Sequence, residues 1–133
     1  MVSSTSAFFS AASSFSFGEA GELSRNVVST FSFENKDLSD PACNASIINY
    51  NISSEKLLLF SNAFDSNERK NLSLSISYDQ GMSWKNNKTI YKGSSAYSSM
   101  TKLKNGDVGL FFEKDNYTKN VFVRVPKKWV LDK

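Results

Sequence analysis

Histidine is absent from all 133 residues of the chain. Without an imidazole, the chain cannot build a Ser-His-Asp or Cys-His catalytic pair, and it offers no histidine ligand to a metal ion. Cysteine is nearly absent too, because Cys43 is the single one. A lone cysteine forms no internal disulfide and indicates no redox compartment, so we expect Cys43 to be an inert, packed thiol. We predict no metal site and no cofactor.

Long apolar runs are also missing, and no stretch approaches the ~20 residues that a membrane-spanning helix needs. The start of the chain lacks a positively charged region, which makes it a poor signal peptide. The formal net charge of +3 is mild. The lysines are scattered among polar turns, without a basic run or an aromatic–basic ladder. The sequence therefore predicts neither a membrane span nor nucleic-acid binding.

Aromatic residues are plentiful, at 14% of the chain with eleven phenylalanines, and they argue against disorder from residue 40 onward. One domain is the limit at this length. Residues 1–40 form a Ser- and Phe-rich segment without a clear period. Two interpretations stay open for it: the remnant of a preceding structural unit, with a strand at 23–33, or sequence read from an interrupted gene.

From residue 41 the pattern is that of β-strands. Leu72, Leu74 and Ile76 share one face of an extended strand, and the serines between them share the other. The run at 57–60 is apolar throughout, as expected of a strand buried on both faces. Short strands between polar turns predict an all-β fold. We expect strands at 46–50, 56–62, 71–77, 84–91, 98–103, 107–113 and 120–125, and a last short one at 129–131.

Two turn signals organise the second half of this pattern. Asn105-Gly106 is a strong signal for a tight hairpin, because both residues tolerate a positive φ. Pro126 ends the strand before it, since proline has no N–H to donate to a sheet.

The octapeptide at 77–84 reads Ser-x-Asp-x-Gly-x-Ser-Trp and predicts a specialised hairpin. The motif begins at Ser77. The carboxylate of Asp79 can accept hydrogen bonds from backbone N–H groups within the turn. Gly81 supplies a positive φ that other residues resist. Trp84 brings a large apolar ring back over the hairpin. These tasks are structural, so we expect no catalysis from this motif.

The sequence around this hairpin resembles the C-terminal third of bacterial-type exo-α-sialidases (neuraminidases). The octapeptide is similar to the Asp box, or BNR repeat, of that family. The segment at 40–47 resembles the family's Pro-x-Cys-Gln-(Ala/Gly)-Ser-Ile segment, with Asn44 where Gln is usual. The resemblance covers about residues 40 to 132. It implies an all-β fold of antiparallel four-stranded blades, with residues 41–133 forming about two to two and a half blades of a six-bladed β-propeller.

The resemblance also implies roles for three residues. Tyr97 matches the family's nucleophile, a neutral phenol that is not repelled by a substrate carrying a carboxylate on its anomeric carbon. Arg69 matches an arginine that clamps this carboxylate with its rigid fork of N–H donors. Glu113 matches a glutamate that orients another arginine of the same triad. We find no match for that arginine, for the remaining one, for the acid/base aspartate or for the base that activates the nucleophile.

These matches imply a fragment of an exo-α-sialidase, a retaining glycosidase that releases terminal sialic acid from sialylated glycans. The parent enzyme is implied to be secreted, periplasmic or on the cell surface. We expect the chain alone to be inactive, because N-terminal blades would have to complete the site. Two alternatives stay open: a glycan-binding Asp-box module without catalysis, and a truncated gene product. Outside this context Tyr97 would be a packed aromatic, Arg69 a surface charge and Glu113 a solvated strand end.

Overall fold

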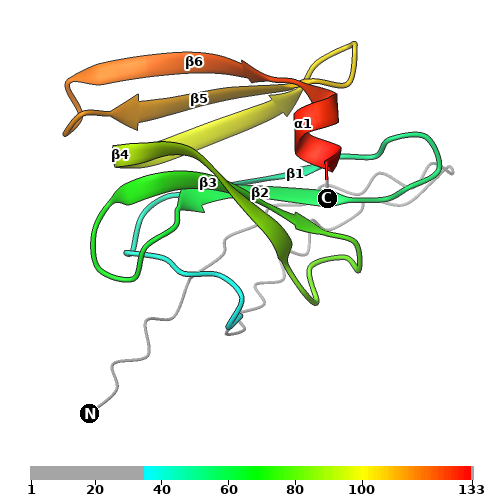
Figure 1. Cartoon of the computed structure of the whole chain (residues 1–133), viewed down its shortest axis with the longest axis horizontal. Helices are drawn as coiled ribbons and strands as arrows, with labels where there is room; N and C mark the ends of the chain where they lie inside the picture. Colours follow the sequence, from blue (N-terminus) through cyan, green and yellow to red (C-terminus); the bar gives the residue numbers. More distant parts are fainter. Residues whose placement is uncertain (1–34, 133) are drawn as a thin grey trace, which may run out of the picture.

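The computed structural model describes residues 35–132, drawn in colour in Figure 1. The strand expected at 23–33 and most of the segment 1–40 lie outside the described residues. Between residues 35 and 132, no helix is both long and apolar enough to cross a membrane. The elements in chain order are β1 (Ser46–Asn49), β2 (Leu58–Ala63), β3 (Lys70–Ser77), β4 (Lys85–Lys102), β5 (Val108–Lys114), β6 (Lys119–Val125) and α1 (Lys127–Leu131).

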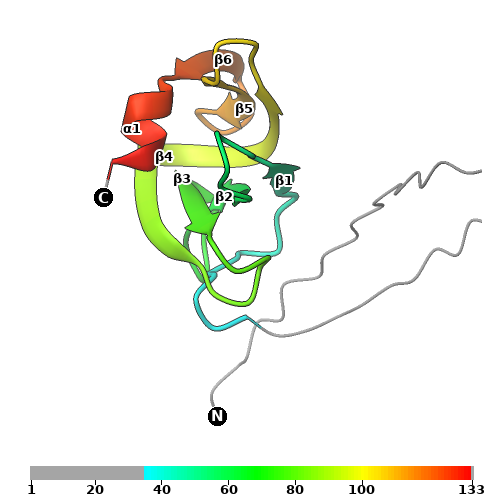
Figure 2. The ribbon, with the colours of Figure 1, turned by 90° about the vertical axis from the view of Figure 1, so that its right-hand side faces the viewer.

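All strands pair antiparallel with their neighbours in sequence, in the order β1-β2-β3-β4-β5-β6. The first part of β4 pairs with β3 and the second part pairs with β5. Figure 2 shows the ribbon of β4 curving from one layer to the other. One layer is therefore the four-stranded blade expected from the sequence, made of β1, β2, β3 and the start of β4. The end of β4, β5 and β6 form the second layer.

The gap expected between strands at 84–91 and 98–103 does not exist, because β4 runs through it as one strand of 18 residues. Its register shifts against β3 next to Ser94 and against β5 after Ser95. Such bulges bend a strand without ending its pairing. The chain thus passes from one blade to the next with its ladder intact.

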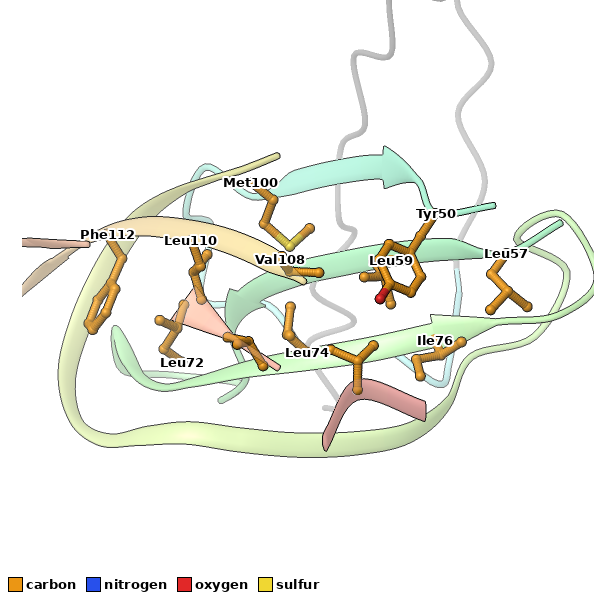
Figure 3. Close-up of a cluster of buried hydrophobic side chains, with 12 residues drawn as sticks. Tyr50, Leu57, Leu59, Leu72, Leu74, Ile76, Met100, Val108, Leu110 and Phe112 are labelled. Atoms are coloured by element: carbon orange, nitrogen blue, oxygen red, sulfur yellow. The ribbon is translucent and has the colours of Figure 1, made fainter. Parts of the chain in front are cut away.

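The hydrophobic core lies between the two layers (Figure 3). Leu72, Leu74 and Ile76 of β3 all point into it, as their alternation predicts, and each is at most 2% exposed. Leu110 of β5 faces them from the second layer and Met100 of β4 closes one side. The apolar face of one blade is therefore buried by the next blade.

The strand expected at 129–131 is wrong, because these residues belong to α1. Pro126 directly precedes the helix as its N-cap, with an extended backbone of φ −62° and ψ 139°. Val130 enters the core with 1% exposure. At the other end, the ammonium of Lys88 donates to the carbonyls of Trp129 and Asp132. A cation suits exposed carbonyls at a helix C-terminus, so burial and this cap together favour helix over strand.

The hairpin expected at Asn105-Gly106 connects β4 to β5, but the turn differs in detail. Gly106 has a φ of +86°, whereas Asn105 does not lie in the left-handed region. The N–H of Gly106 donates to the carbonyl of Leu103 over 2.9 Å. This is the form in which a single left-handed glycine follows an ordinary turn. The hairpin is confirmed, and only its glycine needs a positive φ.

Candidate active site

The hairpin between β3 and β4 is held by the carboxylate of Asp79. It accepts the backbone N–H of Ser83 over 2.9 Å, the hydroxyl of Ser83 over 2.6 Å and the hydroxyl of Ser77 over 2.8 Å. Ser77 in turn accepts the N–H of Gly81 over 2.7 Å. The Ser83 hydroxyl, followed by its backbone N–H, lowers the pKa of Asp79 to about 2. The carboxylate is therefore ionised at neutral pH, and its oxygens accept hydrogen bonds from residues of its own turn.

The apolar end of this hairpin packs on β2. Trp84 is 8% exposed, and its ring centroid lies 5.5 Å from that of Phe60. Leu38 completes this small cluster. Gly81 has a φ of +94°, in the region that favours glycine. We use the name Asp-box hairpin for residues 77–84.

A second group of polar and aromatic side chains gathers beyond the opposite end of β3. Arg69 directly precedes β3, and its carbonyl accepts the N–H of Ser95 in β4 over 2.9 Å. Two residues further along β4, the ring of Tyr97 lies 5.6 Å from the guanidinium carbon of Arg69. This is a cation–π contact. Tyr97 is 45% exposed, so its phenol is open to solvent beside a positive charge.

Two further residues bind Arg69, and neither was expected from the sequence. Its Nη1 donates to the phenol oxygen of Tyr117 over 2.9 Å, and its Nη2 donates to the carbonyl of Ala42 over 3.1 Å. The bond to Tyr117 is the main cause that raises the pKa of Arg69. No local pattern marks Tyr117, whereas Ala42 lies inside the segment that resembles the sialidases. We name Ala42, Arg69, Tyr97 and Tyr117 the arginine cluster.

Glu113 lies near this cluster at the end of β5. Its Oε2 is buried and has no hydrogen-bond partner among residues 35–132. No ion pair joins it to Arg69 within that range. Burial raises the pKa of the Cys43 thiol, Arg69 opposes this rise, and the carboxylates of Asp40 and Glu113 add to it. Cys43 is 8% exposed, and its thiol is influenced by one positive and two negative side chains.

The Asp-box hairpin and the arginine cluster are separated by the whole length of β3. That strand has eight residues, so at about 3.3 Å per residue the two regions lie roughly 25 Å apart. Asp79 cannot act on anything that the arginine cluster binds. In the described part of the chain, no group of three or more His, Cys, Asp and Glu residues is arranged to hold a metal ion.

An Asp-box hairpin between antiparallel strands of packed blades is the mark of BNR repeats. Residues 22–110 match the family described as "BNR repeat-like domain", and the chain belongs to this family. A sialidase of Micromonospora viridifaciens is 38% identical to it over 84 residues, which cover 59% of this chain and 13% of that protein. The predicted resemblance to sialidases is confirmed.

Solved structures give the same result. The chain is similar to the structure titled "Hadza microbial sialidase Hz136", with 25% identity, a TM-score of 0.65 and coverage of 78% of this chain and 22% of that one. It also shares its fold with the intramolecular trans-sialidase from Ruminococcus gnavus, at 19% identity and a TM-score of 0.62, covering 75% of this chain and 26% of that one. The expected fold, an all-β part of a propeller, is confirmed. The chain spans about a quarter or less of the length of these relatives.

Proposed function

We propose that this chain supplies one side of the catalytic site of an exo-α-sialidase, a retaining enzyme that releases terminal sialic acid from glycans. The observation that carries the proposal is the contact between Arg69 and Tyr97, with 5.6 Å between the guanidinium carbon and the ring centroid. A carboxylate clamp and a nucleophile have to meet at one sugar ring, because the carboxylate of sialic acid stands on the anomeric carbon that reacts.

Arg69 binds the substrate's carboxylate in this proposal. A guanidinium has five N–H donors in a planar fork. Tyr117 and Ala42 take one each from Nη1 and Nη2, so further donors remain for a carboxylate. Charge-assisted pairs of this kind are among the strongest hydrogen bonds in proteins.

Tyr97 is the nucleophile in this proposal. Its phenol oxygen attacks the anomeric carbon as the glycosidic bond breaks, and water later hydrolyses the tyrosyl–sugar bond, so the configuration is retained. A phenol with an ordinary pKa of ~10 needs a base to react at neutral pH. No carboxylate binds the phenol of Tyr97 among residues 35–132, so this base has to come from another part of the enzyme. We therefore expect no turnover by the chain alone.

In this proposal Glu113 orients an arginine that another part of the enzyme supplies. A buried carboxylate oxygen without a hydrogen-bond partner destabilises the fold, because burial removes its hydrogen bonds to water and no other hydrogen bond replaces them. The Oε2 atom of Glu113 is such an oxygen. A guanidinium from a neighbouring blade would satisfy it and would stand near Arg69.

A chimera tests these roles. Residues 40–132 replace the aligned segment of the Micromonospora viridifaciens sialidase, and hydrolysis of a fluorogenic sialoside is measured. We expect activity that Tyr97→Phe lowers by roughly 100-fold or more in kcat, while the exposed Tyr78→Phe changes little. A folded chimera whose activity is insensitive to Tyr97→Phe would refute the nucleophile. Sialoside binding without any turnover would favour the glycan-binding module instead.

A further inference from the structure

We propose that Tyr117 is a positioning residue for Arg69, holding its guanidinium in the orientation that receives the substrate's carboxylate. The proposal rests on the function proposed above and adds a residue to it. Tyr117 itself is 55% exposed and comes from the hairpin between β5 and β6. It acts through Arg69, because its phenol oxygen accepts from Nη1 over 2.9 Å.

The guanidinium of Arg69 is restrained from three directions. Tyr117 holds Nη1, the carbonyl of Ala42 holds Nη2, and the guanidinium carbon lies over the ring of Tyr97, 5.6 Å from its centroid. An exposed arginine normally keeps much rotamer freedom, and ordering it costs free energy. Here the fold orders the side chain before any ligand arrives, and such preorganisation strengthens the binding of a carboxylate.

The hairpin that presents Tyr117 has an unusual backbone. Asp115, Asn116 and Tyr117 are consecutive residues with φ values of 52°, 53° and 65°. Side chains other than glycine resist this left-handed region, and runs of it occur only where the surroundings enforce them. Ala42, which supplies the other acceptor, has a φ of 57° as well. Both partners of Arg69 therefore come from backbone that the fold keeps in a disfavoured conformation.

The start of the Tyr117 hairpin is enforced by β4. The N–H of Asp115 donates to the carbonyl of Ser94 over 3.0 Å, and the N–H of Asn116 donates to the Ser94 hydroxyl over 3.2 Å. The phenol of Tyr91 donates to Asp115 over 2.5 Å. A Cβ on Gly93 would lie 2.3 Å from that phenol oxygen, so a larger residue there would displace the Tyr91 ring and disturb its bond to Asp115. The stretch of β4 that carries the nucleophile thus also fixes the hairpin that holds the clamp.

The test compares the whole chain with Tyr117→Phe, which removes one hydroxyl from an exposed ring. Nitrogen-15 NMR of the arginine side chains reports rotation about the Cζ–Nη bonds and needs no ligand. We expect slowed rotation at both Nη atoms of Arg69, and we expect Tyr117→Phe to speed the rotation at Nη1, whose hydrogen bond it removes, while Ala42 still holds Nη2. The exposed Tyr78→Phe is the matched control and should change nothing at Arg69. Unchanged Arg69 signals in Tyr117→Phe would overturn the proposal.

A titration with N-acetylneuraminic acid then separates this proposal from the proposed function. We expect Tyr117→Phe to weaken binding roughly three- to tenfold, the effect of one lost hydrogen bond. Freed Arg69 signals together with no binding by the parent chain and no turnover by the chimera would support the positioning role and refute the function. Freed signals with unchanged affinity would refute the role in binding, because the restraint would then have no effect on the clamp.

Discussion

The two ends of β3 carry regions of opposite character. In the Asp-box hairpin the side-chain hydrogen bonds of Ser77 and Asp79 stay within the turn. The carboxylate of Asp79 accepts from Ser77 and Ser83, and the hydroxyl of Ser77 accepts the N–H of Gly81. The arginine cluster is assembled from four separate segments of the chain. Beside it, the Oε2 atom of Glu113 stays without a partner within residues 35–132. Polar groups with hydrogen-bond partners stabilise a fold, whereas accessible or unpaired polar groups near a positive charge indicate a binding site for a ligand or for another part of the protein.

Left-handed backbone does not distinguish the two regions, because Gln80 in the hairpin has a φ of 60° just as Tyr117 in the cluster has a φ of 65°. The difference lies in what the strained residues serve. In the hairpin they close a turn on itself. In the cluster they aim acceptors at one guanidinium. The comparison predicts that changes in the hairpin lower stability and changes in the cluster lower binding.

The largest effect on stability is expected from Trp84→Ala. The indole is 8% exposed and packs on Phe60, so its removal leaves a cavity and should cost about 3–5 kcal/mol of unfolding free energy. Trp129→Ala on α1, where the ring is 37% exposed, is the matched control and should cost much less. Chemical denaturation measures both. Equal losses would break the claim that the hairpin is a structural centre.

A smaller loss is expected from Asp79→Ala, which removes the acceptor of three hydrogen bonds. We expect the melting temperature to fall by roughly 4–8 °C, while Glu55→Gln in an exposed turn leaves it unchanged. Thermal unfolding followed by circular dichroism is the measurement. An unchanged melting temperature would show that the hairpin does not depend on its carboxylate.

Acid should act on the same group. The pKa of Asp79 is lowered to about 2 from 3.8, so the folded state favours the ionised form. Its stabilising contribution is complete above the unfolded pKa and is lost as the pH falls from about 4 through 2. The stability of the parent chain should therefore drop more steeply in this window than that of Asp79→Ala. Parallel curves of unfolding free energy against pH would contradict this.

Much of the hairpin could be predicted from sequence, because its contacts are local. Asp79, Gly81 and Trp84 lie within one octapeptide, and the alternation of β3 follows from the two faces of a strand. The arginine cluster could be predicted only in part. Resemblance to sialidases singled out Arg69 and Tyr97, but no local pattern reveals an acceptor 48 residues away in sequence.

The other differences have the same origin. β4 continues past residue 91 because bulges turn it while β3 and then β5 keep pairing with it. α1 forms because Val130 finds room in the core and Lys88 reaches the helix end. Both outcomes depend on partners distant in sequence, so the residue pattern within one strand does not predict them.

The smallest effect on stability is expected from Arg69→Lys. Its guanidinium donates to the exposed Tyr117 and to the carbonyl of Ala42, and solvent-exposed bonds of this kind contribute little, so the unfolding free energy should stay within about 0.5 kcal/mol. Lysine keeps the charge but lacks the fork, so affinity for N-acetylneuraminic acid should fall roughly tenfold. Arg124→Lys, on β6, is the control for affinity. A loss of stability comparable to that of Trp84→Ala would place Arg69 among the structural residues.

The most direct test of the division between the two regions is an amide chemical-shift map of the chain titrated with N-acetylneuraminic acid. The account predicts saturable shifts at Arg69, Ser95 and Tyr97, with Asp79 and Gly81 unmoved. Shifts centred on the hairpin, or none at the arginine cluster up to the highest sugar concentration, would contradict it.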